Sequence, residues 1–169
     1  MSNKVKQYIE DVLAEKRQEF GNKAVCPFAK PELESNKLMI ATIGDKSLGQ
    51  LIDEFYLSKY ESALLIIKDD VPAEQTQKFQ IFVNKVLKTK GLKQYKNICF
   101  NPNDEVAVDG YNPRSKAPYF MINIAHREVL LNAQAALEKT NYYDKLPEDY
   151  KKFLKLSSKP KTNKWDLLL

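Results

Sequence analysis

Histidine, cysteine and glycine are scarce in this chain of 169 residues, and their scarcity argues against several familiar kinds of site. The only histidine is His126, and the two cysteines, Cys26 and Cys99, do not form a Cys-x-x-Cys pair, which disfavours a zinc ribbon or a dithiol centre. With five glycines there is no glycine-rich phosphate loop, no dinucleotide fingerprint and no Gly-x-Ser-x-Gly elbow. The sequence therefore predicts neither a bound metal nor a cofactor.

Long apolar runs are also missing, although 43% of the residues are apolar and suffice for a sizeable core. No run approaches the roughly 20 residues that a membrane helix needs. The first residues lead into an amphipathic pattern rather than the apolar centre of a signal peptide. Two cysteines without such a signal are typical of a reducing compartment. We therefore expect a cytoplasmic protein with no membrane partner.

Acidic residues are fewer than basic ones, 22 against 27, which gives a net charge of +5. Much of the excess lies near the end of the chain, in Lys151, Lys152, Lys155, Lys159, Lys161 and Lys164. A basic chain end can help a protein to bind nucleic acid. A solvated lysine-rich end is the simpler interpretation, so nucleic acid is a permitted partner but not the favoured one.

Hydrophobic periodicity alternates between helix and strand along the chain. Helical spacing covers 5–20, 48–56, a segment that opens at Pro72 and ends at Gly91, 127–139, and a last segment from Pro147. Strand patterns cover 38–43, 63–67, 97–100 and 119–124, with a further short or edge strand at 105–109. Ser47 and Gln50 form the pattern of a helix capping box.

This alternation predicts an α/β fold, with α+β as the alternative, in a single domain over 1–156 and a lysine-rich tail over 157–169. We expect a mixed, mostly parallel sheet of four or five strands covered by helices. The apolar run at 63–67 shows no alternation, which is typical of a central strand covered on both faces.

Cys26 is the first candidate for chemistry, because it stands beside Pro27 at the junction between a helix and a strand. Lys23 and Lys30 flank it in sequence, and a nearby cation lowers the pKa of a thiol and makes it more nucleophilic. The alternative is that Cys26 packs in the core, where free cysteines are common. Cys99 lies within a strand and is expected to be a buried structural thiol.

The loop with Arg114, Ser115 and Lys116 is a second candidate, because arginine and lysine hold carboxylates and phosphates. A solvated loop is the alternative. His126 stands where a strand passes into a helix, a frequent place for a functional group. A Cys26–His126 pair would let the histidine act as a base, but one cysteine and one distant histidine form a poor signature.

Three segments resemble a family of uncharacterised bacterial proteins that is classified only as a domain of unknown function. Cys26-Pro27-Phe28-Ala29 is similar to the family's Cys-Pro-Phe-Ala signature, and Phe100-Asn101-Pro102 is similar to its Phe-His-Pro step. The segment from Lys116-Ala117-Pro118-Tyr119 to Arg127-Glu128 is similar to a strand that ends Leu-Leu-Arg-Glu. Asn101 and Asn123 stand where the family carries histidines, and His126 matches none of them. The resemblance implies a shared pocket but no reaction.

The leading hypothesis is a protein that binds an anionic small molecule, and modifies it if Cys26 is a catalytic thiol. The pocket is expected at the carboxyl ends of the strands. Arg114 or Lys116 would hold the anion, Asn101 and Asn123 would form hydrogen bonds with it, and His126 would complete the ligand-binding set. The alternative is an interaction module without catalysis that meets nucleic acid through its basic C-terminal region. The sequence predicts no oligomeric state.

Overall fold

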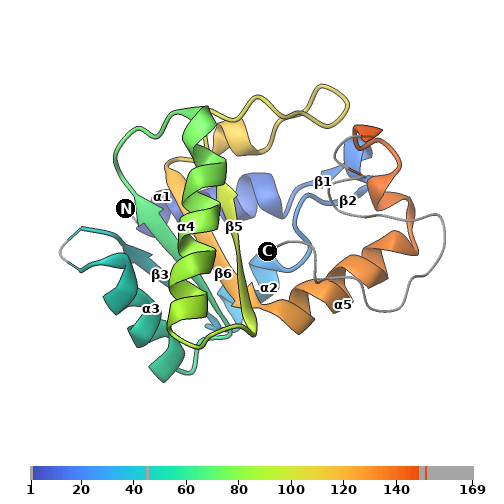
Figure 1. Cartoon of the computed structure of the whole chain (residues 1–169). Coiled ribbons are helices and arrows are strands. Elements are labelled where there is room, and N and C mark those ends of the chain that lie inside the picture. The colour runs from blue at the N-terminus through green and yellow to red at the C-terminus, as the bar shows by residue number, and fades with distance from the viewer. Residues whose placement is uncertain (1, 45, 149–150, 152–169) are drawn as a thin grey trace.

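The computed structural model describes residues 2–44, 46–148 and 151, and its centre is a β-sheet with helices on both faces (Figure 1). The strands are β1 (Lys16–Arg17), β2 (Lys23–Ala24), β3 (Leu38–Thr42), β4 (Ser62–Ile67), β5 (Tyr95–Phe100) and β6 (Phe120–His126). The α-helices are α1 (Ser2–Tyr8), α2 (Ala29–Glu34), α3 (Leu48–Leu57), α4 (Thr76–Thr89) and α5 (Arg127–Glu138). Most of the predicted helix from Pro147, and the whole predicted tail over 157–169, lie outside the described residues.

The central sheet has the strand order β3-β4-β6-β5 and is mostly antiparallel. Only β3 and β4 run parallel, whereas β6 is antiparallel to both of its neighbours. A single α+β domain with a mixed sheet of four strands is thus confirmed, but the prediction of mostly parallel strands is wrong.

The connection from β5 to β6 explains this error. It spans 101–119 and contains only a 3-10 helix at Arg114–Lys116, so no α-helix carries the chain across the sheet. A parallel pair normally needs such a crossover, and without it the returning strand enters antiparallel. The loop instead folds over one face of the sheet, where Val108, Tyr111 and Ala117 are buried.

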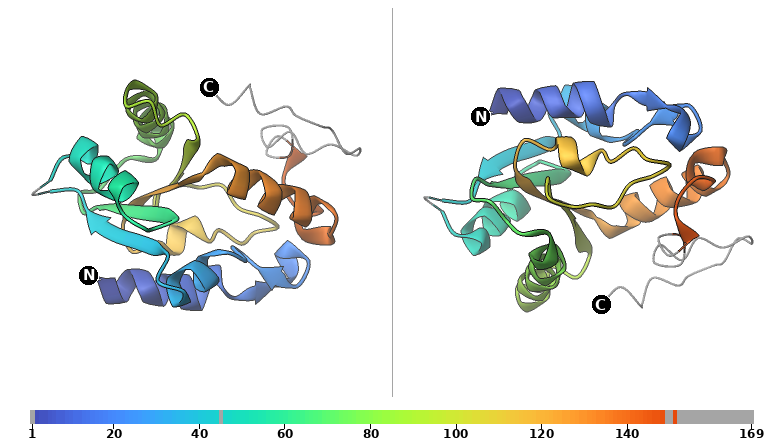
Figure 2. Two further views of the ribbon diagram at one scale, coloured as in Figure 1. Left: turned by 90° about the horizontal axis from the view of Figure 1, so that it is seen from below. Right: turned by 90° about the horizontal axis from the view of Figure 1, so that it is seen from above.

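Two hydrophobic clusters cover the two faces of the sheet. Figure 2 shows α3 and α4 on one side of the sheet and α1 on the other. Under α3 and α4 lie Leu51, Ile52, Phe55, Val83 and Leu87, packed against inward residues of β4, β5 and β6. The other cluster joins α1, the π-helix Ile9–Leu13, the 101–119 loop and Tyr142 to the opposite face. Every side chain of β4 is buried except that of Ile67, which is half-buried, as expected for a covered central strand.

Local signals account for several element boundaries. Ser47 accepts a hydrogen bond from the Gln50 amide at 3.3 Å, and the Gln50 side chain accepts one from the Ser47 amide, which confirms the capping box of α3. The predicted strand over 105–109 is reduced to a single bridge between Val108 and Tyr111. Asp109 and Gly110 between them both have positive φ, as in a two-residue hairpin turn, but the pairing does not continue beyond this bridge.

The first predicted helix is shorter than its periodicity indicates. The chain leaves the helical path after Leu13, and Lys16–Arg17 then pairs with Lys23–Ala24 in a two-stranded sheet. Gly21 has φ +62° in the connection between these strands, a left-handed conformation that suits glycine. Gly21 is part of a tight connection that also brings Val25 and Cys26 back against the end of the π-helix, where their amides donate to the Glu15 and Leu13 carbonyl oxygens.

Candidate functional site

Cys26 lies against the N-terminal segment rather than at an open site. Its amide donates to the Leu13 carbonyl oxygen at 2.7 Å, and its sulfur accepts from the amides of Phe28 and Ala29 at the start of α2. The residue packs on the cluster that contains Tyr8 and Tyr142, and the Tyr142 hydroxyl donates to the Val25 carbonyl oxygen. Cys26 keeps some exposed surface, but its sulfur is surrounded by protein.

This environment does not activate the thiol. Burial raises the pKa of Cys26 above its ordinary value, and the two amides that donate to the sulfur lower the pKa by less. The Glu32 carboxylate raises the pKa further, and neither Arg114 nor Lys116 is among these influences. Cys26 is therefore a protonated thiol at neutral pH, with two amides placed to stabilise a thiolate if one forms.

Glu32 is a half-buried carboxylate whose charge contributes to the raised pKa of Cys26. Burial raises its pKa, while the hydrogen bond that it accepts from Ser62 Oγ at 2.5 Å lowers the pKa by a smaller amount. Because the pKa of the folded state lies above the ordinary value, the carboxyl favours folding most when it is protonated. This contribution is present below the ordinary pKa and is lost as the pH rises through the raised pKa.

Glu32→Gln should therefore stabilise the protein at neutral pH. Glutamine stays uncharged and its oxygen can still accept from Ser62, so we expect a gain of a few tenths of a kcal/mol at pH 7 to 8, given partial solvent screening. The gain should vanish near pH 4. Urea unfolding across this pH range measures it, with Glu34→Gln, an exposed carboxylate on the same helix, as the control. An equal gain at both pH values would contradict the raised pKa of Glu32.

The cations of the predicted basic loop have partners within the protein. Arg114 forms an ion pair with Asp104, and both side chains are mostly buried. Lys116 lies 4.7 Å from the centroid of the Tyr111 ring, and Arg17 lies over the same ring at 4.0 Å. Tyr8 links the loop to the surroundings of Cys26, because its hydroxyl donates to the Pro113 carbonyl oxygen at 3.0 Å. These contacts give the loop a structural role on the face of the sheet that α1 covers.

The two predicted asparagines occupy different environments. Asn101 is fully buried, and its amide group donates to the Val71 carbonyl oxygen at 3.0 Å and to Thr76 Oγ1 at 2.8 Å. Its oxygen accepts from the Asn103 amide at 2.9 Å, so both ends of the side chain hold the protein together. Asn123 is half-buried in β6, and its amide group donates to the Ala63 carbonyl oxygen at 3.4 Å.

His126 is the last residue of β6, and its neighbours Tyr95 and Arg127 belong to a separate pocket. Its ring packs edge-on against Tyr95, with centroids 5.5 Å apart, and it pairs with Tyr95 in the β5–β6 ladder. The next residue, Arg127, begins α5, and its amide donates to the Gln94 carbonyl oxygen at 2.7 Å. Tyr95 and Arg127 both line a pocket of about 200 Å³ at the edge of the sheet.

This pocket is strongly basic. It is lined by Asn84, Leu87, Lys88, Leu92, Lys93, Tyr95, Lys96 and Arg127. Four of these eight residues are cationic and none is acidic. They come from the end of α4, from the α4–β5 connection, from the start of β5 and from the start of α5. Tertiary folding therefore concentrates four positive charges around one small cavity.

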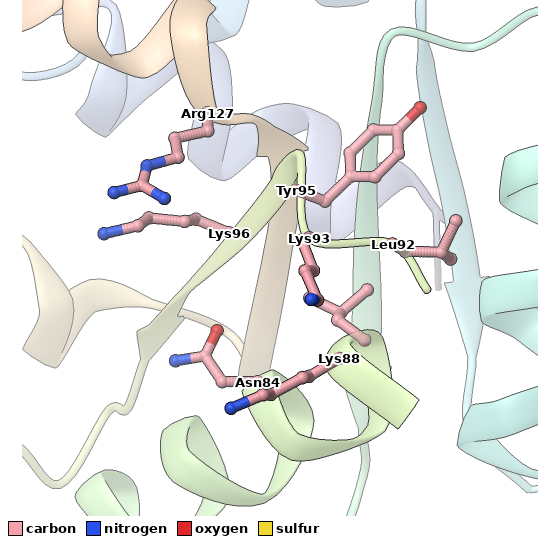
Figure 3. Close-up of a pocket in the computed structure, with 8 residues that line it drawn as sticks. Asn84, Lys88, Leu92, Lys93, Tyr95, Lys96 and Arg127 are labelled. Carbon is pink, nitrogen blue, oxygen red and sulfur yellow. The ribbon is translucent and has the colours of Figure 1, made fainter. Parts of the chain in front are cut away.

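Figure 3 shows how the polar ends are arranged. The side chains of Arg127 and Lys96 run side by side, and their nitrogen atoms lie on the same side of the sheet edge as the ends of Asn84 and Lys88. Tyr95 and Leu92 point the other way. The Asn84 oxygen accepts from the Asn97 side chain at 2.7 Å, which fixes the orientation of the Asn84 amide and directs its donor group away from Asn97.

The position of the pocket differs from the prediction. It lies at the end of the sheet where β5 begins and β6 ends. The carboxyl ends of β3, β4 and β5 lie at the other end of the strands. The rule that places ligands at carboxyl ends applies to open parallel sheets, and this sheet is mostly antiparallel. A signal was present in the sequence, because lysines recur closely between Lys85 and Lys96. Only the β5–β6 pairing adds Arg127 to them.

Comparison with known proteins provides no further assignment. No family model, no curated protein and no solved structure matches this chain. The resemblance to the uncharacterised bacterial family therefore remains a prediction. Within the described residues, no helix is long and apolar enough to cross a membrane, and no three His, Cys, Asp or Glu side chains gather as a metal site. The basic pocket beside α5 is the site on which a functional proposal can be based.

Proposed function

We propose that this protein binds an anionic small molecule in the pocket formed by α4, β5 and the start of α5. The observation that carries the proposal is that Lys88, Lys93, Lys96 and Arg127 line one cavity and that none of its lining residues in the described part of the chain is acidic. A bound anion gains favourable interactions with several of these cations at once, and the walls of a concave site screen such interactions less than open water does.

The chemistry of the lining favours a phosphate ester or a compound with several carboxylates. Arg127 supplies a planar fork of donors that matches phosphate or carboxylate oxygens, while the lysines supply mobile point charges. Lys96 and Arg127 are half-buried, so both act in a partly desolvated environment. A cavity of about 200 Å³ is smaller than the range of roughly 300–1,000 Å³ typical of drug-sized ligands, and therefore suits a small metabolite-sized anion.

The start of α5 adds to this potential. Arg127 is the first residue of the helix, and the preceding His126 makes no side-chain capping hydrogen bond. The N-terminus of a helix carries partial positive charge and amides that face outward. The helix therefore adds positive potential of the same sign as the four side chains.

The proposal retains the predicted class of ligand and changes the residues that bind it. Arg114, Lys116 and Asn101 make contacts within the protein, and none of the three is among the residues that line the cavity. Thiol chemistry at Cys26 is not part of this proposal, because burial raises the pKa of that thiol. The predicted nucleic-acid partner relied on the C-terminal region, nearly all of which lies outside the described residues.

Calorimetric titration with pyrophosphate tests the proposal, with citrate and a single-stranded oligonucleotide as comparison ligands. We expect pyrophosphate to bind and its affinity to fall as salt is raised. Arg127→Met and Lys96→Met should each weaken binding about tenfold, because each keeps the aliphatic stem and removes one charge-assisted contact worth about 1.4 kcal/mol. Lys4→Met removes the same charge from α1, on the other side of the sheet, and should have no effect.

Three results would contradict the proposal. The first is that none of the anions binds. The second is that Lys4→Met weakens binding as much as Arg127→Met, because the attraction would then be a property of the net charge. The third is binding of the oligonucleotide alone, with a steep salt dependence, which would favour the nucleic-acid hypothesis.

A further inference from the structure

A chain of hydrogen bonds fixes one uncharged polar side chain of the basic pocket. It begins at the Gln80 carbonyl oxygen in α4, which is a backbone acceptor and therefore needs a donor. The Asn97 side-chain nitrogen donates to this oxygen at 3.1 Å and to the Asn84 side-chain oxygen at 2.7 Å. Asn84 lines the pocket, whereas Asn97 is buried and is not among the lining residues.

Cys99 fixes the other end of the Asn97 amide. Burial raises the pKa of the Cys99 thiol to about 12, so the thiol is protonated at neutral pH and can donate. Its sulfur lies 3.7 Å from the Asn97 side-chain oxygen, in a hydrogen bond. The two ends of the Asn97 amide therefore agree on one orientation, with the nitrogen toward Gln80 and Asn84 and the oxygen toward Cys99.

This orientation determines what Asn84 offers to a ligand. Because the Asn84 oxygen accepts from Asn97, the amino group of Asn84 is directed away from Asn97. Figure 3 shows the end of Asn84 on the same side of the sheet edge as the nitrogen atoms of Lys96 and Arg127. Asn84 thus presents N–H donors to the pocket, and its acceptor oxygen is held by Asn97.

The other polar side chains beside Asn84 are donors as well. Lysine and arginine carry no hydrogen-bond acceptor, and Leu87 and Leu92 carry no polar side-chain atom. Tyr95 points away from the cationic side-chain ends (Figure 3). Among the lining residues that the structure describes, Asn84 is therefore the one beside the cations whose side chain contains an acceptor, and its orientation decides whether a ligand meets donors only.

We propose that the pocket selects oxyanions that carry no proton, such as sulfate and the dianions of phosphate monoesters, and that Asn84 is the residue that makes this selection. The selection rests on the proposed anion pocket and specifies its ligand. An unprotonated oxygen accepts from every N–H group around it, whereas a P–OH group needs an acceptor and otherwise sets its proton against donors. A polar group that is left without a partner costs more affinity than one formed hydrogen bond adds.

Three dianions of equal charge test the selection in calorimetric titrations at pH 8 and low salt. They are sulfate, methyl phosphate and hydrogen phosphate, and only hydrogen phosphate carries a proton on an oxygen. Sulfate and hydrogen phosphate are nearly equal in size and shape. We expect sulfate and methyl phosphate to bind about fivefold more tightly than hydrogen phosphate, because one O–H group loses its hydrogen-bond partner.

Asn84→Asp converts the free end of this side chain from a donor to an acceptor, while its other oxygen can still accept from Asn97. The variant should weaken binding of all three dianions, because it adds a negative charge, and it should reverse their order so that hydrogen phosphate binds more tightly than sulfate. Asn36→Asp adds the same charge at an exposed position after α2 and should leave both the affinities and their order unchanged.

Asn97→Leu tests the positioning role of the buried residue. Leucine is close to asparagine in size and removes the hydrogen bond that holds the Asn84 oxygen, so Asn84 can rotate while the four cations stay in place. The preference for sulfate over hydrogen phosphate should disappear, a result that a loss of stability alone would not produce. Circular dichroism verifies that each variant folds.

The outcomes separate this selection from the pocket itself. Equal binding of sulfate and hydrogen phosphate, with both weakened by Arg127→Met, would overturn the selection and leave the anion pocket in place. A preference for sulfate that survives Asn84→Asp unchanged would also overturn the selection, because other groups would then make it. If no anion binds, the selection and the proposed anion pocket fail together.

Discussion

Asn101→Ala is expected to lower the free energy of unfolding by about 3 kcal/mol, a large effect for one polar side chain. Asn101 is fully buried and donates to both the Val71 carbonyl oxygen and Thr76 Oγ1, while its oxygen accepts from the Asn103 amide. Removing the side chain leaves a cavity and deprives several buried groups of a hydrogen-bond partner, each of which costs about 1–3 kcal/mol. Urea unfolding followed by circular dichroism measures the loss.

The control for this prediction is Asn103→Ala, which should cost less than 1 kcal/mol because Asn103 is exposed. The comparison decides between two roles for Asn101. A structural residue loses stability when it is truncated, whereas the ligand-binding role expected from the sequence predicts lost affinity with little change in unfolding. Unchanged stability of Asn101→Ala would therefore favour the ligand-binding role.

Cys26 in the folded protein is expected to react with iodoacetamide on the order of a hundredfold more slowly than in the urea-unfolded chain at pH 7.5. Two effects act together, because burial raises the pKa of the thiol and limits access of the reagent to the sulfur. Mass spectrometry of the labelled peptides separates Cys26 from Cys99. Burial raises the pKa of Cys99 to about 12, so Cys99 provides an internal reference for an unreactive thiol.

The pH dependence makes this prediction more specific. Because the pKa of Cys26 lies above its ordinary value, its labelling rate should still be rising at pH values where an ordinary thiol has reached its plateau. Labelling at pH 7 as fast as in the unfolded chain would contradict the structure and support the activated thiol considered from the sequence. The Phe28 and Ala29 amides would then be the groups that stabilise the thiolate.

The strands and helices of the sheet were largely predictable because their signals are local. The apolar run at 63–67 and the capping box at Ser47 predicted β4 and α3, and both are confirmed. The strand direction was not predictable, since it depends on how the chain returns from β5 through a loop of mixed composition. The prediction of one long first helix failed for a similar reason, because pairing between Lys16–Arg17 and Lys23–Ala24 replaces the second half of that helix.

The candidate site was less predictable than the fold. The sequence led to the hypothesis of an anionic ligand, and it drew attention to Arg114 and Lys116 because arginine and lysine hold carboxylates and phosphates. Arg114 pairs with Asp104 and Lys116 lies over the Tyr111 ring, and no spacing in the sequence reveals these contacts. Lys88, Lys93 and Lys96 were not among the residues predicted to form a site, and only the pairing of β5 with β6 brings Arg127 beside them.

By itself the sequence determined what depends on neighbouring residues and on composition. This includes the positions of the sheet strands, the cap of α3, the surplus of positive charge and the scarcity of residues for metal or dithiol chemistry. Tertiary structure decided which charges meet, whether Cys26 is exposed, and which residues line the pocket. The physical reason is that pKa values, ion pairs and pockets depend on distances between residues far apart in the chain, and those distances exist only after folding.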